Sequence, residues 1–86
     1  MGESMVILKI MPEEPGLEDK VIEQLKKLKA GKLQDSKKEP LAFGMYIIMA
    51  GIVIPNIKEG EVALLEAEVK KIKGVESVTV EGETLL

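Results

Sequence analysis

The side chains that could do chemistry in this sequence are almost all carboxylates and lysines. Its 86 residues include 15 acidic and 12 basic side chains, every basic one a lysine, and no cysteine, histidine, arginine or tryptophan. A Ser-His-Asp or Cys-His nucleophile and a Cys/His zinc site are therefore excluded. No arginine is present to grip a phosphate or a guanine edge. We expect no catalytic residue, no metal ligand and no cofactor, and a protein that is not an enzyme.

Lysines clustered in one segment could serve binding instead. Residues 26–38 carry six lysines against one aspartate, a net charge of +5 within a chain whose net charge is −3. Such a patch could attract an acidic protein surface or a phosphate-rich partner. The first three of these lysines equally fit the end of a helix, where cations complement the helix dipole; they are Lys26, Lys27 and Lys29. No helix end explains Lys37 and Lys38, which are candidates for electrostatic steering of a partner.

The two aromatic side chains, Phe43 and Tyr46, are the other binding candidates. Two aromatics are too few for a base-stacking platform, and with a pI of 5.0 we expect no direct binding of nucleic acid. A core position is the commoner fate of a phenylalanine. Phe43, however, lies between Pro40 and Gly44 where a loop meets a strand, so its side chain can be presented outward. Tyr46 fits equally an anchor on an open sheet face and a cross-strand packing residue.

Hydrophobic periodicity predicts the elements that must position these residues. We expect strands over 5–11, 32–39, 45–54 and 75–80, helices over 17–30 and 59–73, and a tail over 82–86. Val6, Leu8 and Ile10 should share one strand face, and each helix has one apolar stripe. Gly31 and Gly74 should supply left-handed caps where the two helices end. The first of the middle two strands, rich in lysine, should be an exposed edge, and the second should be central.

The order βαββαβ predicts an α+β fold of the ferredoxin-like split type. With right-handed crossovers it gives a four-stranded antiparallel sheet with both helices on one face. The opposite face then has no helix over it, so its apolar side chains must tolerate solvent or meet a partner. A chain of 86 residues has room for one core, which predicts a single domain over residues 1–86.

Residues 40–57 contain no charged side chain, which raises the question of a membrane span. The apolar part, residues 41–54, would reach only about 21 Å as a helix, whereas a hydrocarbon core is about 30 Å thick. Its isoleucine and valine content favours a buried strand instead. We therefore expect no membrane association, and the absence of cysteine and of a secretion signal fits the cytoplasm.

One segment at the entry to the most apolar strand resembles the signature of the elongation factor 1-beta family: Lys38-Glu39-Pro40-Leu41-Ala42-Phe43-Gly44. Residues 5–12 resemble the first strand of that family, and residues 73–80 resemble the entry to its last strand. The chain length resembles the archaeal form, which is little more than the exchange domain. The resemblance implies a translation elongation factor that promotes release of GDP from elongation factor 1-alpha, the GTPase that carries aminoacyl-tRNA, after which GTP reloads it.

The resemblance also implies roles for individual residues. In the family, the phenylalanine of this motif inserts into a pocket of the GTPase, a role that falls on Phe43. The surrounding residues would shape the loop or border the contact; they are Glu39, Pro40, Leu41, Ala42, Gly44 and Tyr46. Eukaryotic members also place a lysine next to the C-terminus, near the magnesium of the GTPase, whereas this chain has no lysine after Lys73. Either no terminal lysine displaces that ion or another group does, and Lys37 and Lys38 are candidates.

Two other functions fit the same residues. A ligand-binding regulatory module of ferredoxin-like fold would dimerise through its open sheet face without any GTPase. An RNA-binding module would use the segment of net charge +5, although the missing arginines and the lack of paired aromatics oppose it. The sequence leaves the oligomeric state open between these functions.

Overall fold

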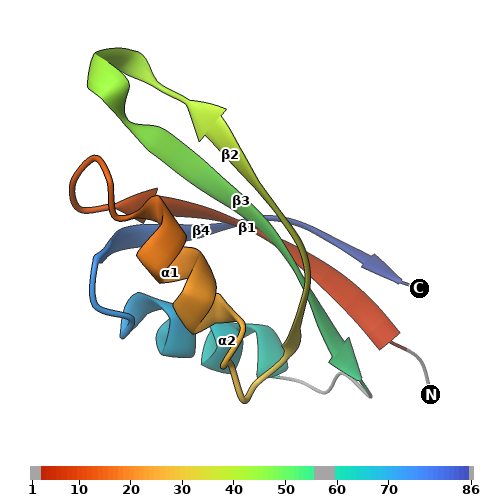
Figure 1. The fold of residues 1–86 in the computed structure, drawn as a ribbon. Coiled ribbons are helices and arrows are strands. Elements are labelled where there is room, and N and C mark those ends of the chain that lie inside the picture. The colour runs from red at the N-terminus through yellow and green to blue at the C-terminus, as the bar shows by residue number, and fades with distance from the viewer. Residues whose placement is uncertain (1–2, 56–59, 86) are drawn as a thin grey trace.

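The computed structural model describes residues 3–55 and 60–85 and has the predicted order of strands and helices (Figure 1). The elements are β1 (Glu3–Pro12), α1 (Glu18–Leu25), β2 (Lys32–Pro40), β3 (Tyr46–Pro55), α2 (Glu61–Lys70) and β4 (Val75–Leu85), with a tight turn at Ala42–Gly44. All strand pairs are antiparallel, in the order β2-β3-β1-β4. Both helices cover the same face of the sheet. The ferredoxin-like α+β fold is therefore confirmed.

The core lies between this face and the two helices. Every second residue of β1 points into it, and Val6, Leu8 and Ile10 are fully buried, as predicted. The other members of the buried cluster come from β3, the two helices and the start of β4; they are Val21, Leu25, Ile48, Ala50, Ile52, Ile54, Leu65, Val69 and Val75. The predicted apolar stripes of both helices thus supply the packing that holds them on the sheet.

Neither of the described helices lies over the opposite face of the sheet, which is largely closed by its own side chains. Met5 and Ile7 lie over the position of Gly51, where an added Cβ would come within 3.1 Å of the Met5 sulfur. Ile47 and Val53 of the same face are 7% and 9% exposed. Long, flexible methionine side chains fill such irregular surfaces well. None of the large apolar side chains recorded as exposed in the described residues lies on this face.

Helix α1 ends at Leu25, whereas its apolar stripe predicted a helix to residue 30. The N–H groups of Lys27 and Leu28 already donate only three residues back, and a tertiary contact from α2 then prevents the helix from continuing. The carboxylate of Glu68 accepts the backbone N–H of Lys29 and that of Ala30, each at 2.9 Å. In a continued helix those N–H groups would donate to carbonyls four residues back. The competing carboxylate draws this backbone out of the helix and into the approach to β2.

The two predicted glycine caps are wrong. The cap residue of α1 is Lys26, and Gly31 is not left-handed; it packs so closely that an added Cβ would lie 2.5 Å from Cγ2 of Ile52. Helix α2 ends at Lys70 rather than residue 73, and its cap residue is Lys71. Gly74 is left-handed, with φ +102°, but it turns the chain into β4. Its carbonyl accepts the Glu13 N–H at 2.8 Å. The predicted helix start at residue 59 lies outside the described residues.

The predicted C-terminal tail is also wrong, because β4 continues to Leu85. Val80 pairs with Leu8 and Gly82 with Ile7, so Glu81 is an extra residue in β4 at a β-bulge. The bulge restores the pairing, and the strand then runs along the first half of β1 as far as Ser4. Short-range sequence patterns cannot reveal this pairing, since the partner strand lies at the other end of the chain.

Candidate functional site

The β2–β3 hairpin extends beyond the rest of the sheet (Figure 1). Strand β1 pairs with β3 only as far as Ile48, whereas β2 continues to pair with β3 through Ile47 and Tyr46. The final part of the hairpin is therefore two-stranded, and no other strand of the described residues lies beside it. Its end is the position in the fold where a side chain is held farthest from the core.

The hairpin tip, defined as residues 40–46, contains a turn in which the chain reverses within a few residues. Phe43 has φ 63° and ψ 30°, and Gly44 has φ +76°, so two successive residues are left-handed. The N–H of Met45 donates to the carbonyl of Ala42 at 3.4 Å, and the N–H of Leu41 donates to the carbonyl of Met45 at 2.7 Å. These two bonds close the loop between Pro40 and Tyr46, the last residue pair of the hairpin.

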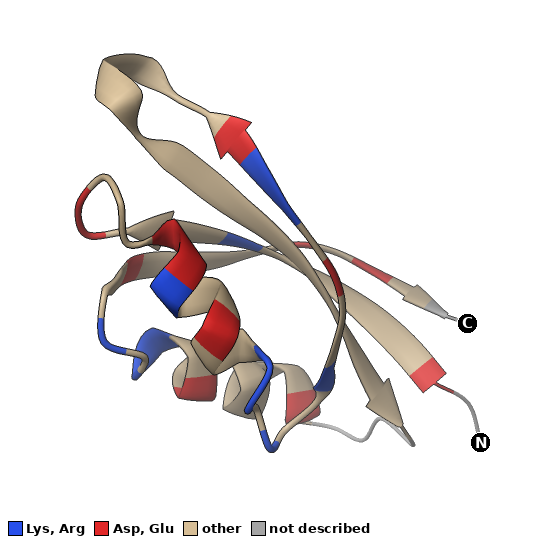
Figure 2. Cartoon of the chain, in the orientation of Figure 1, with Lys and Arg blue, Asp and Glu red and all other residues tan. Residues whose placement is uncertain are grey.

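Phe43 stands at the outermost point of this turn and is 96% exposed. The Phe43 side chain therefore contributes almost nothing to the core. It points outward into solvent. Leu41 and Tyr46, at the two ends of the loop, are each 40% exposed. Pro40, Ala42 and Gly44 are exposed as well, so six of the seven predicted contact residues are brought together at the tip, and the seventh, Glu39, lies just before it in β2, opposite Ile47. Figure 2 shows that the tip carries no charged side chain.

Tyr46 does not lie on the open face of the sheet. Alternate residues of β3 share a face, and Tyr46 is in phase with Ile48, whose side chain is buried beneath the helices. Its partner across the strand pair is Pro40. Of the two roles considered for Tyr46, the geometry matches a cross-strand position beside the tip, and the open-face position is wrong.

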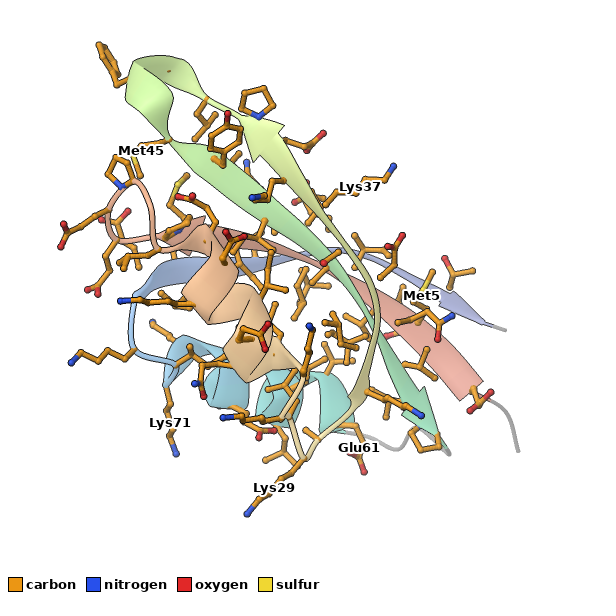
Figure 3. All side chains as sticks on the ribbon, in the orientation of Figure 1. Met5, Lys29, Lys37, Met45, Glu61 and Lys71 are labelled. Carbon is orange, nitrogen blue, oxygen red and sulfur yellow. The ribbon has the colours of Figure 1, made fainter. Side chains whose placement is uncertain are left out.

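Lys37 and Lys38 point to opposite faces of β2, so they do not form one basic patch. Lys38 is opposite Ile48 and reaches α1, where its Nζ lies 3.1 Å from Oδ1 of Asp19. Lys37 is opposite Met49, on the open face, and Figure 3 shows it pointing away from the helices. Neither lysine is part of the turn itself. Of the two steering candidates, Lys37 is the one with no ion pair recorded within the described residues.

The three lysines predicted to end the first helix follow it instead. The last turn of α1 contains no basic residue. Lys26 is the cap residue and lies 3.4 Å from Glu23 Oε1, while Lys27 and Lys29 belong to the connection toward β2. The segment of net charge +5 is thus spread over a loop and an edge strand. Favourable interaction with the helix dipole does not explain all of its charge.

Hollows among the described residues include one on each side of the sheet. One, of about 310 Å³, lies on the open face between Met5, Met49 and Gly51, with Asp35, Lys37 and Glu39 at its rim. The other, of about 740 Å³, lies between α1 and the connection from α2 to β4, and its charged lining includes Glu13, Glu14, Lys71 and Lys73. Sequence patterns do not reveal the second one, because its walls come from residues 13–24 and residues 71–74, which lie far apart in the chain. No group of three or more carboxylates in the described residues gathers closely enough to hold a metal ion.

The end of β4 lies at the opposite end of the sheet from the tip (Figure 1). Leu85 pairs with Ser4, which in turn pairs with Ile54 near the far end of β3. The long axis of the molecule is 43 Å. A residue at the end of β4 therefore cannot share one compact contact with Phe43.

Comparison with known proteins identifies close likenesses over the whole chain. The EF-1 guanine nucleotide exchange domain family matches residues 5–85. Elongation factor 1-beta of Methanospirillum hungatei is 35% identical over 86 residues, which is 100% of both chains. The protein of the same name from Metallosphaera sedula is 37% identical over 89 aligned positions, covering 100% of this chain and 98% of its own. The one from Archaeoglobus fulgidus is 34% identical and covers 100% of both.

Solved structures with a similar fold include the ACT domain of a GTP pyrophosphokinase from Chlorobium tepidum. It has a TM-score of 0.64 at 14% identity and covers 91% of this chain and 97% of its own. The C-terminal domain of the MgtC protein from Mycobacterium tuberculosis has a TM-score of 0.61 at 17% identity and covers 99% and 88%. At such low identity these two likenesses support the fold alone. Neither described helix is long and apolar enough to cross a membrane.

Proposed function

Because this chain belongs to the family of EF-1 guanine nucleotide exchange domains, we propose that it promotes GDP release and GTP reloading on the elongation factor 1-alpha GTPase. The contact in this proposal is the hairpin tip, with Phe43 as its anchor. The observation that supports it is the 96% exposure of the Phe43 side chain on an uncharged, projecting turn. Isolated aromatic side chains that fill a partner's pocket commonly dominate the affinity of a protein interface.

The exchange needs no acid, base or nucleophile from this chain. A GTPase holds its nucleotide through a phosphate-binding loop and a magnesium ion. A partner that binds better to a state with a distorted phosphate site must, by linkage, weaken nucleotide binding by the same factor. Insertion of Phe43 would supply that preference. No covalent bond is made or broken, so the chain acts as a binding partner and not as an enzyme, in the cytoplasm where translation occurs.

The residues around Phe43 have supporting roles in this proposal. Leu41 and Tyr46, each 40% exposed, would extend the apolar contact on either side of the ring. The tip bears no charge, so the acidic and basic side chains lie on the surfaces behind it. Rim charges of this kind change association rates more than dissociation rates. Lys37 is placed for that role, whereas Lys38 is held by Asp19.

Release of a fluorescent GDP analogue from elongation factor 1-alpha of the same organism tests the proposal. The unaltered chain should accelerate release, and Phe43→Ala should reduce the second-order rate constant of exchange at least tenfold. The magnitude follows from burial of a phenylalanine side chain, which contributes about 1.5–3 kcal/mol, or roughly 10- to 150-fold. Since Phe43 is almost fully exposed in the free protein, the variant should unfold at the same urea concentration as the unaltered chain.

Leu64→Ala is the matched control. Leu64 is another large, exposed apolar side chain, 63% exposed, but it lies on α2, away from the tip. Its removal should leave exchange unchanged. Equal losses in the Phe43 and Leu64 variants, or no acceleration by the unaltered chain with an active GTPase, would contradict the proposal. In the second case, self-association measured by sedimentation would test the dimeric regulatory module instead.

A further inference from the structure

The turn at the hairpin tip has the geometry of a type I′ turn. That type needs φ near +60° and ψ near +30° at its first central residue and a positive φ at its second. Phe43 has φ 63° and ψ 30°, and Gly44 has φ +76°. The closing bond, from the Met45 N–H to the Ala42 carbonyl, is the one such a turn requires. Type I′ turns are favoured in hairpins with two-residue loops because their twist matches that of the strands, and here such a turn forms the end of a longer loop between Pro40 and Tyr46.

The first central residue of this turn is of an unsuitable type. Asparagine and aspartate are preferred there, because they tolerate the left-handed region, whereas a bulky side chain is strained in it. Phe43 is the one non-glycine residue with a positive φ in the described part of the chain. Its 96% exposure shows that no burial within the fold offsets the strain. Strain held at a site in this way is a recognised sign of function.

The second central residue is required for its backbone and not for its small size. A Cβ built on Gly44 would find no atom within 4 Å. Any side chain would therefore fit in space, and only the left-handed φ of +76° restricts the choice. Replacing a glycine usually changes both the backbone preference and the local packing. At position 44 the open space allows the backbone effect to be measured alone. A substitution at position 44 changes the conformational preference of the turn and removes no contact.

We propose that Gly44 is a positioning residue, which holds the Phe43 ring in its binding orientation before the partner arrives. The proposal rests on the proposed function, because the partner is the GTPase whose pocket accepts the ring. The strained Phe43 backbone lowers the stability of the free chain. The same backbone conformation presents the Phe43 ring, so the turn need not rearrange when the partner binds. When only a fraction of molecules has the binding conformation, the apparent dissociation constant rises in inverse proportion to that fraction.

Substitutions at position 44 test this role through the concentration dependence of exchange. Gly44→Val disfavours the left-handed backbone and should raise the half-maximal concentration of this protein about tenfold, the effect expected for a non-glycine residue forced into that region. The maximal rate of GDP release should stay the same, since the bound molecules all have the correct turn. Gly44→Asn tolerates a positive φ and should restore the half-maximal concentration to within about threefold of the original.

A second arm measures the free protein alone. Phe43→Asn creates an Asn-Gly pair, the preferred sequence for this turn, and removes no buried surface. It should raise the melting temperature by about 4–8 °C while losing exchange activity. Gly60→Val is the control for left-handed strain elsewhere. Gly60 has φ +88° and equally open space, but it precedes α2, at the other end of β3 from the tip. This control should lower stability and leave the half-maximal concentration unchanged.

The outcomes separate this role from the proposed function. The positioning role is supported if Gly44→Val raises the half-maximal concentration and Gly44→Asn does not. It also requires that Phe43→Asn is more stable than the unaltered chain and inactive in exchange. Equal behaviour of Gly44→Val and Gly44→Asn, or no stabilisation by Phe43→Asn, overturns it while the unaltered chain still promotes exchange. If the unaltered chain itself fails to accelerate release, the proposed function and the positioning role are both overturned.

Discussion

Replacing Glu68 by alanine is expected to destabilise the protein by about 2.5–4 kcal/mol, because its carboxylate accepts the only hydrogen bonds recorded, within the described residues, between α2 and the connection that follows α1. One oxygen accepts the Lys29 N–H and the other the Ala30 N–H, both at 2.9 Å. A hydrogen bond to a charged group contributes about 1.5–3 kcal/mol. The bond to Ala30 is partly buried and takes roughly that value, while the exposed bond to Lys29 takes roughly 1 kcal/mol.

The measurement is urea unfolding followed by far-ultraviolet circular dichroism, which suits a chain without tryptophan. For a domain of this size, a loss of 2 kcal/mol lowers the melting temperature by about 8–16 °C. Glu68→Gln retains one acceptor oxygen in the same shape and should lose about half as much stability. Glu66→Ala is the control, because Glu66 lies on the same helix and makes no hydrogen bond recorded among the described residues.

The result that would refute the reasoning is a Glu68→Ala variant as stable as Glu66→Ala. Stability could then not depend on the two hydrogen bonds. The helical signal adds an independent check. If Glu68 is what ends α1 at Leu25, its removal should allow the apolar stripe to extend the helix toward residue 30, and the helical signal of the folded variant should rise.

Two further predictions concern the surface and the sheet. Gly31→Ala should destabilise by about 1–3 kcal/mol in the same unfolding assay, because its Cβ would lie 2.5 Å from Ile52 Cγ2 and 3.1 Å from the Val53 carbonyl; a change below 0.5 kcal/mol would show that the backbone yields there. Lys37→Ala should slow association with the GTPase at low salt, measured by stopped flow, more than Lys38→Ala does, since Lys38 is already paired with Asp19; equal rates would remove Lys37 from the encounter surface.

The fold could be predicted because its signals are local. Alternation in β1 identified the buried face of Val6, Leu8 and Ile10, and spacings of three and four residues identified both helices. Where prediction failed, a distant partner decided the outcome. The carboxylate of Glu68 ends α1, and the first half of β1 extends β4 into the expected tail. Neither partner is visible in a window around the affected residues.

The sequence allowed the candidate contact residues to be chosen, and their contact role stays a prediction, but it did not allow their geometry to be foreseen. The segment from Pro40 to Gly44 identified the tip, and the projecting hairpin collects all of it. The left-handed turn could not be foreseen, since Phe-Gly is not the pair that type I′ turns favour. The separation of Lys37 from Lys38 follows from strand alternation, which assigns neighbouring residues to opposite faces. That rule was available from the sequence once the edge strand had been predicted.

The position of the chain ends has a practical consequence for studying the tip. The described ends of β1 and β4 meet where Ser4 pairs with Leu85, at the end of the sheet opposite the β2–β3 turn (Figure 1). A tag, a fluorophore or a fused protein attached at either of these ends therefore leaves the turn accessible. On a sensor surface, a chain coupled through the end of β4 would present Phe43 toward the solution, so that kinetic measurements with a soluble GTPase would test the proposed contact without obstruction.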